Sequence, residues 1–189
     1  MFVINCIKHA KTIVLHKKEV LKLSIIAGIP FQGLIHDLSK FSPSEFIESA
    51  KYFQGNRSPI MACKEDKGYS IAWQHHKGRN KHHAEWWVDK LYAGGEPIKI
   101  EYKYIVEMCI DIIAASKTYN GENFKPNMPY DYWIEKLTKT TLMHNQSQLF
   151  VKTVLKNYSK YGNKALNPLF TKKLYKSITK KYQNNQNQD

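Results

Sequence analysis

We predict an all-α fold from three features of the sequence. Apolar residues recur at steps of three, four or seven residues through several long segments, as they do along one face of a helix. Helix start and stop signals bound several of these segments, and no stretch shows a convincing strand pattern. With 42% hydrophobic residues among 189, the chain can form the core of one domain.

The first helix is predicted over residues 3–27, where apolar side chains follow the helical period: Ile4, Ile7, Val14, Leu21 and Ile25. Gly28 and Pro30 suit the positions just beyond a helix C-terminus. A short apolar piece at 31–41 is also expected to be helical.

The stretch SPSEF starts the next predicted helix, which reaches about residue 53. Ser42 suits the N-cap, Pro43 suits the first helical position, and Glu45 completes a capping box. Residues 54–70 are predicted to form a loop.

Four helical segments are predicted in the middle of the chain: 71–76, 83–92 (ending at Gly94 and Gly95), 100–116 and 130–137. The sequence KGRN separates the first two segments. The stretch NGENFKPNMP is predicted to be a loop between the last two.

A basic helical extension is predicted at the C-terminus. From residue 147 one helix face carries Phe150, Val154 and Tyr158, while another carries lysines. Residues 169–182 show the same amphipathic pattern, and 183–189 are predicted to form a frayed polar tail. We therefore divide the chain into a main domain at 1–146 and a basic helical extension at 147–189.

The formal net charge of +13 is concentrated in this extension, because residues 136–188 contain lysines but no acid. Lysine suits phosphate contacts, so the segment allows nucleic acid as a partner. Interleaved aromatic residues suit stacking on single strands and suit a core equally well: Tyr158, Tyr161, Phe170, Tyr175 and Tyr182. Solvated faces of packed helices explain the same charge.

Three widely spaced cysteines without a C-x-x-C pattern argue against a disulfide framework and for a reducing, cytoplasmic setting. No apolar run approaches the roughly 20 residues of a membrane span, and we expect no membrane partner.

Four of the eight histidines lie within the nine residues HHKGRNKHH: His75, His76, His82 and His83. Gly78 favours a turn that brings both doublets toward one point. Tryptophans flank the cluster, which indicates partial burial, where an unpaired imidazole costs free energy. The alternative is a solvated, weakly basic loop.

Three other sites carry histidine or aspartate in apolar surroundings. His16 lies in the first predicted helix, His36 and Asp37 are adjacent, and Asp111 lies in the apolar helix 100–116. A carboxylate in such a helix is costly unless it is paired or bound to metal. Each residue taken alone has a structural explanation.

Taken in order, this set resembles the HD-domain metal-dependent phosphohydrolase superfamily over about residues 10–116. The resemblance implies an all-α HD-like bundle with one or two divalent transition-metal ions (Mn, Fe, Co, Ni or Zn). It implies these ligands: His16, His36, Asp37, the doublets His75, His76, His82 and His83, and Asp111. His76 and His83 are the first choices within the doublets, followed by His82.

HDLSK is similar to the His-Asp-x-x-Lys form of the superfamily's motif, in which the lysine faces phosphate. Two longer segments, HDLSKFSPSEF and AWQHHKGRNKHHAEWW, also look like a small uncharacterised branch of the superfamily, met in phage and bacterial genomes. The implied activity is hydrolysis of a nucleotide or another small phosphate ester by a metal-activated hydroxide. Asp37 and Lys40 are the expected catalytic residues, and the acid/base residue stays open. Lys40, Arg79 and Asn80 are the expected substrate contacts, and Asn80 is alternatively expected to orient a histidine.

Two alternatives remain. The first is a non-catalytic nucleic-acid-binding protein that uses its basic tail. The second is an HD-type di-iron oxygenase, because some superfamily members use the same ligands for that reaction. Tyrosine and tryptophan patches would also suit a homo-oligomer.

Overall fold

The computed structural model describes residues 2–89 and 96–186, and the all-α prediction is confirmed for them. These residues form no strand beyond one isolated bridge between Val88 and Pro97. The elements, in chain order, are α1 (Phe2–Ile26), α2 (Pro30–Ile35), η1 (Leu38–Phe41), α3 (Pro43–Lys51), α4 (Pro59–Lys67), α5 (Ile71–Lys77), η2 (Ala84–Trp87), α6 (Tyr102–Asn120), η3 (Gly121–Asn123), α7 (Met128–Tyr132), the π-helical η4 (Trp133–Leu137), α8 (Thr138–Thr140), α9 (Asn145–Tyr161), η5 (Gly162–Leu166) and α10 (Pro168–Gln186).

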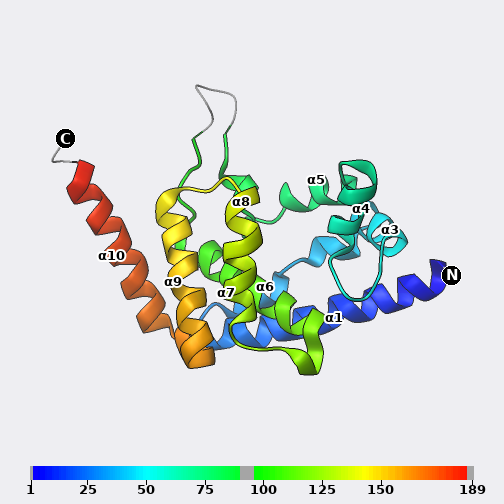
Figure 1. Ribbon diagram of the computed structural model, residues 1–189, viewed down its shortest axis with the longest axis horizontal. Coiled ribbons are helices and arrows are strands. Elements are labelled where there is room, and N and C mark those ends of the chain that lie inside the picture. Colours follow the sequence, from blue (N-terminus) through cyan, green and yellow to red (C-terminus); the bar gives the residue numbers. More distant parts are fainter. Residues whose placement is uncertain (1, 90–95, 187–189) are drawn as a thin grey trace.

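The long helix α1 lies along one edge of the molecule, and α2, α3, α6 and η5 pack against it (Figure 1). Helices α3, α4 and α5 gather near its N-terminal half. Helix α6 packs against α1 and α9, and α10 lies outermost, against α9 and η5. The hydrophobic core is formed mainly by α6 and α9, with side chains from α1.

Helix α1 is confirmed, but the apolar row that predicted it faces outward. Ile4 is 56% exposed and Ile25 is 60% exposed. The opposite face is buried and carries His9, Ile13, His16, Val20 and Leu23. Because both faces are apolar, the period alone could not identify the inner one. The inner face is the one that brings His16 into the molecule.

Two predictions between residues 42 and 70 were wrong. Ser42 occupies the N-cap of α3 and Pro43 its first turn, but Glu45 forms no capping box. The Glu45 side chain instead turns inward to two histidines. The predicted loop at 54–70 contains helix α4, which starts at Pro59 and ends before the left-handed Gly68. Both are ordinary helix-end signals.

The helix predicted at 83–92 is also wrong over the described residues. Only the short 3-10 helix η2 forms, and Val88 then pairs with Pro97. The backbone N–H of Ile98 donates to the carbonyl of Trp87, which satisfies that carbonyl outside a helix. Gly94 and Gly95 lie outside the described residues.

The C-terminal helices follow the predicted pattern. Phe150, Val154 and Tyr158 are buried, and the lysines on the other face of α9 are exposed. Helix α9 shares its core with α6. Helix α10 continues to Gln186, beyond the predicted start of fraying, and 187–189 lie outside the described residues. The division at residues 146 and 147 stays a prediction.

The cysteines at positions 6, 63 and 109 are free thiols. Among the described helices, none combines the length and the apolar character needed to cross a bilayer.

Candidate metal centre

The junction between α2 and η1 places His36 and Asp37 at the centre of the molecule. Gly33 lets α2 lie directly on α1, because a Cβ at this position would come within 2.5 Å of the Ser24 Cβ. The ammonium of Lys17 donates to the backbone carbonyl of His36. Asp37 has a left-handed backbone, with φ at 52°, a region that Asp tolerates better than most residues. These contacts fix the direction of both side chains.

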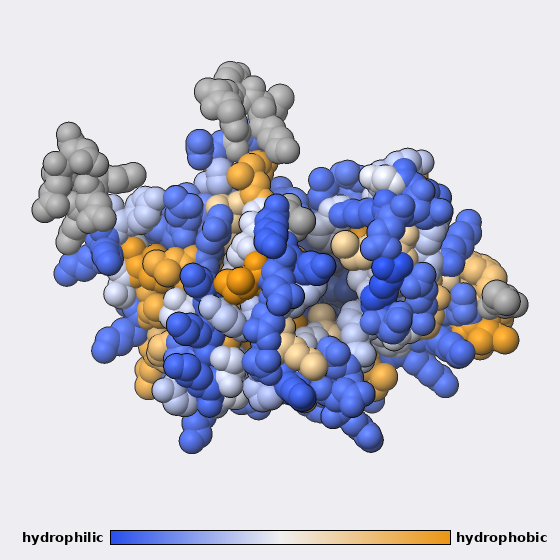
Figure 2. Space-filling model, viewed as in Figure 1, coloured by the Kyte–Doolittle hydropathy of each residue, from blue (hydrophilic) through white to orange (hydrophobic). Residues whose placement is uncertain are grey.

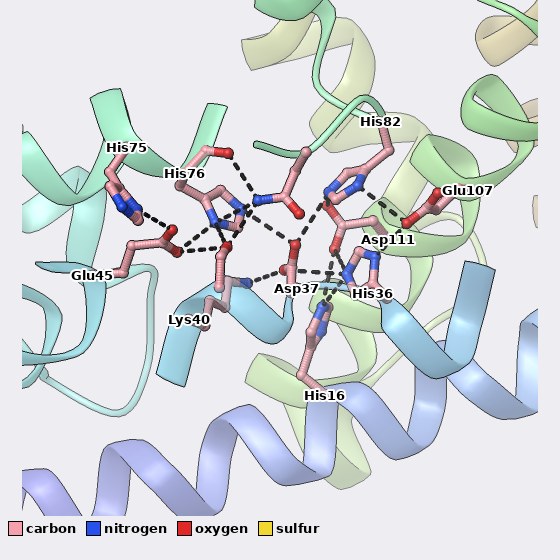
Figure 3. Close-up of polar contacts among 12 residues, drawn as sticks. His16, His36, Asp37, Lys40, Glu45, His75, His76, His82, Glu107 and Asp111 are labelled. Atoms are coloured by element: carbon pink, nitrogen blue, oxygen red, sulfur yellow. Dashed lines mark hydrogen bonds and ion pairs between the residues drawn. The ribbon is translucent and has the colours of Figure 1, made fainter. Parts of the chain in front are cut away.

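A first group of ligands joins α1, this junction and α6 (Figure 3). Nε2 of His16 lies 3.0 Å from Oδ1 of Asp111 and 3.4 Å from Nε2 of His36. Nε2 of His36 lies 3.1 Å from Oδ2 of Asp37. One ligand atom from each of the four residues lies within 4.8 Å of the others. Two imidazoles and two carboxylates suit a divalent transition metal.

A second group joins Asp37 to α5 and the segment before η2. Nε2 of His76 and Nε2 of His82 each lie 3.4 Å from Oδ1 of Asp37. His83 completes the group within the same 4.8 Å limit. Asp37 therefore belongs to both groups, and its two oxygens point to different histidines. A carboxylate in this position can bridge two metal ions.

Two glutamates hold the outer nitrogens of the ligand histidines. Oε1 of Glu107, on α6, lies 2.9 Å from Nδ1 of His36 and 3.2 Å from Nδ1 of His82. Oε2 of Glu45 lies 2.7 Å from Nδ1 of His76. A carboxylate only accepts, so each Nδ1 carries a proton toward its glutamate, and each Nε2 is directed at the centre. Such outer carboxylates are typical of histidine ligands in metal sites.

Several ligand atoms lack the hydrogen bonds that burial normally requires. Nε2 of His82 and Nε2 of His83 are buried without a hydrogen-bond partner among the described residues. Both oxygens of Asp37 also lack a well-directed hydrogen bond, although Nζ of Lys40 lies 2.6 Å from Oδ2. Buried polar atoms without partners are costly. Their convergence on one point fits a metal ion that would coordinate them.

In the first group, the two carboxylates are in the charged form that binds a metal, whereas His36 is not in the neutral form. Burial would raise the pKa of Asp37, but the opposing charges of His36 and Lys40 hold it well below its usual value. The pKa of Asp111 is also well below its usual value, because hydrogen bonds from His16 and His36 outweigh burial. For His36, burial would lower the pKa, but Asp37 and the neighbouring carboxylates raise it well above 6.5.

Among the candidate ligands, the two other histidines with a shifted pKa favour the neutral form. Burial lowers the pKa of His16, with Asp111 opposing that effect in part. Burial, together with the neighbouring His82 and His76, lowers the pKa of His83 well below its usual value. Neutral imidazole is the form that binds a metal. A metal ion would therefore displace a proton mainly at His36.

The centre is open on the side of Lys40 and Asp111. Their side chains are 27% and 21% exposed, whereas that of Asp37 is 1% exposed. The ion pair with Asp37 keeps the ammonium of Lys40 charged, since it raises the pKa against the effect of burial. Figure 2 shows the surface hollowed between the part formed by α3–α5 and the part formed by α7 and α8. A small molecule can thus approach the ligands from this side.

Three predicted site residues, His75, Asn80 and Arg79, lie outside the two four-residue ligand groups. His75 turns away from the centre: its Nδ1 lies 2.6 Å from Glu45, and its Nε2 lies 3.0 Å from Ser44. The amide of Asn80 donates to the hydroxyl of Ser39 and to the carbonyl of His76, so it stabilises the turn that follows His76. The side chain of Arg79 is exposed, and only its backbone contacts His76.

Sequence reasoning missed both outer glutamates. Glu107 precedes Asp111 by four residues on the apolar helix α6, and this i, i+4 pair of buried acids was a usable signal. Glu45 had a sufficient local explanation in the expected capping box. The contacts that define its role come from residues 30 and 31 positions away.

A family model described as a family of unknown function (DUF5662) matches residues 5–179. All the candidate ligands lie inside this region. No curated protein and no solved structure matches the chain.

Proposed function

We propose that this chain, which belongs to that family of unknown function, is a metal-dependent phosphohydrolase. The observation that carries the proposal is the sharing of Asp37 between two four-residue ligand groups, next to the charged Lys40. The resemblance to the HD-domain superfamily supports it, since these ligands occur in the order of that superfamily. An HD-like bundle is accordingly part of the proposal.

The residues suit a pair of ions. His16, His36 and Asp111 would hold one ion and His76, His82 and His83 the other, with Asp37 contributing to both. Bound divalent ions would lower the pKa of water from 15.7 to roughly 7 and neutralise charge on phosphoryl oxygens.

The protein's own contribution is orientation and charge. Glu107 holds Nδ1 of His36 and Nδ1 of His82, which directs the Nε2 atom of each ring to the centre. Lys40 provides a positive charge on the open side, where it would contact the phosphate of the substrate. Burial of Asp37 and its neighbours lowers the local dielectric, which strengthens these interactions.

The direct test is phosphate release. The purified protein, loaded in turn with Mn, Fe, Co, Ni or Zn, would be assayed against a panel of nucleotides and simple phosphate esters. Asp37→Asn should abolish release. Lys40→Gln should lower kcat/KM on the order of 10²-fold while leaving the metal content unchanged, because it removes a charge that contacts phosphate and ligates no metal.

Other outcomes would overturn the proposal. No metal uptake under any loading condition would exclude a metal centre. Iron in the protein, with oxygen uptake and without phosphate release, would indicate the di-iron oxygenase chemistry that the same ligands permit. Activity that survives Asp37→Asn would place the reaction outside this site.

A further inference from the structure

We propose that α10 and Lys99 form a second site, which binds the phosphate backbone of nucleic acid without reading its sequence. The proposal is independent of the metal centre. It rests on a surface that α10 presents at the outer edge of the molecule (Figure 1).

One face of α10 is a continuous row of lysines. A shallow groove of about 570 Å³ runs along this face and is lined by Leu169, Lys172, Lys173, Lys176, Ser177 and Lys180. Leu169, Lys172, Lys176 and Lys180 follow one another at steps of three or four residues, and Lys173 lies three residues before Lys176, so these side chains share one side of the helix. The opposite side packs on the protein through Thr171 and Ile178. From residue 136 to residue 188 the chain contains no acid that could neutralise the row.

Lys99 joins this row from a distant part of the chain. A second groove of about 580 Å³ is lined by Lys99, Tyr175, Lys176, Thr179 and Lys180. The two grooves share Lys176 and Lys180, and they therefore form one surface. We call it the lysine surface and define it by Lys99, Lys172, Lys173, Lys176 and Lys180.

Lys99 is held in place rather than free in solvent. Its Nζ lies 4.1 Å from the centre of the Tyr175 ring and contacts the hydroxyl of Thr179. Burial lowers the pKa of its ammonium. Within residues 2–89 and 96–186, Lys99 forms no ion pair with Glu96, Glu101 or any other carboxylate. A half-buried ammonium without a carboxylate partner fits an anionic ligand.

The composition of the lysine surface favours a phosphate polymer over a lipid membrane. Leu169, 81% exposed, is the one large apolar side chain lining the grooves besides Tyr175, which packs under Lys99. A helix that lies in a bilayer interface needs an apolar face to insert, and the lining of these two grooves offers only Leu169 and the packed ring of Tyr175. Lysines without arginines or exposed aromatic rings contact phosphates but do not read bases.

The size of the surface sets the expected salt dependence. Residues 172–180 span about 12 Å of helix, at 1.5 Å per residue, and a nucleic-acid strand rises 3.4 Å per nucleotide. The lysine surface should therefore engage roughly four phosphates. The logarithm of the binding constant should fall with the logarithm of salt concentration with a slope of roughly −3 to −4.

The experiment measures fluorescence anisotropy of labelled 20-nucleotide DNA, single-stranded and duplex, from 50 to 200 mM NaCl with the full chain and EDTA. The triple variant Lys172→Gln, Lys176→Gln, Lys180→Gln should weaken binding at least tenfold at 50 mM and reduce the slope by roughly two units. Lys99→Gln should reduce it by roughly one.

The matched control removes three exposed lysines from α1: Lys8→Gln, Lys11→Gln and Lys18→Gln. This variant has the same net charge as the α10 variant and should bind like the parent chain. Equal weakening in the two triple variants would overturn the proposal, because binding would then follow net charge. Absence of binding to either DNA at 50 mM salt would also overturn it, as would tighter binding to phosphatidylserine vesicles when these are titrated at the same salt concentration.

Discussion

Nδ1 of His36 donates a hydrogen bond to Oε1 of Glu107, 2.9 Å away. The same oxygen lies 3.2 Å from Nδ1 of His82, and these two histidines belong to different ligand groups. One carboxylate thus orients a ligand in each half of the centre. Its loss should affect both halves together.

Glu107→Gln is expected to weaken metal binding by roughly 10- to 100-fold, because the amide cannot accept two hydrogen bonds from imidazoles as strongly as the carboxylate. Calorimetric titration with Co²⁺ or Zn²⁺ measures the metal affinity of each of the two ligand groups. Glu45→Gln is the matched control, since Glu45 supports only His76 among the ligands, and it should weaken one affinity only. If Glu107→Gln changes neither affinity in a folded protein, Glu107 does not orient the ligands.

The two members of the doublet HH at 75 and 76 should behave differently. His76→Gln should remove metal from the group that contains His82 and His83, whereas His75→Gln should keep the parent metal content. Nδ1 and Nε2 of His75 are both engaged, by Glu45 and Ser44, and the ring lies outside both ligand groups. Elemental mass spectrometry of both purified variants tests this. Equal metal loss would show that His75 also binds.

The fold was predictable where a helix is long and its period is clear. Helices α6, α9 and α10 were found from apolar rows, and α9 also shows the predicted buried and exposed faces. The inner face of α1 was not predictable, because isoleucines and valines also cover its outer face. The helix predicted at 83–92 stops after η2 in the described residues, since Val88 pairs with Pro97 and the carbonyl of Trp87 accepts from the backbone of Ile98.

The candidate site also contains residues that the local sequence pattern predicts and residues that it does not. His16, His36, Asp37 and Asp111 stood out because polar residues in apolar segments need a reason. The turn of His75 away from the two ligand groups and the approach of Glu107 to His36 depend on contacts between residues 30 to 71 positions apart. Such contacts follow from packing of whole helices, which local patterns do not specify.

Asp37→Asn is expected to remove metal from both groups, because Asp37 is the one residue common to them. Asparagine keeps the size of the side chain and tolerates the left-handed backbone at this position, so the fold should persist. Asp111→Asn should leave one ion per chain, since Asp111 belongs to one four-residue group. The metal-to-protein ratio of each purified variant gives the number of ions lost. Loss of a single ion in Asp37→Asn would mean that Asp37 does not bridge two ions.

Metal binding should release protons. The pKa of His36 lies well above 6.5 in the metal-free protein, so its ring is protonated near neutral pH and an ion must displace that proton. Affinity should therefore rise with pH between 6 and 8. Calorimetry in two buffers of different ionisation enthalpy gives the number of protons released. We expect about one per chain for the His36 group, and a value near zero would contradict the assignment.

The stability of the metal-free protein should fall as pH falls, in part because of His9. This ring packs 5.2 Å from Phe46 and 5.4 Å from Phe53, between centroids, and its Nδ1 has no hydrogen-bond partner among the described residues. Burial, with a smaller effect from the charge of Lys40, lowers the pKa of His9 from 6.5 to about 4. The unfolded chain therefore takes up this proton first, and the contribution to stability is present above pH 6.5 and lost as pH falls toward 4.

His9→Leu should remove this dependence, because leucine fills a similar volume and does not titrate. When the pH is lowered from 7 to 5, the unfolding free energy of the parent chain should fall by about 1 kcal/mol more than that of the variant, allowing for solvent screening. Urea unfolding at both pH values, with EDTA present, measures that difference. The buried ligands His16 and His83 titrate in both proteins, so their contributions cancel in the comparison. Parallel pH dependences of the two proteins would show that His9 is not desolvated.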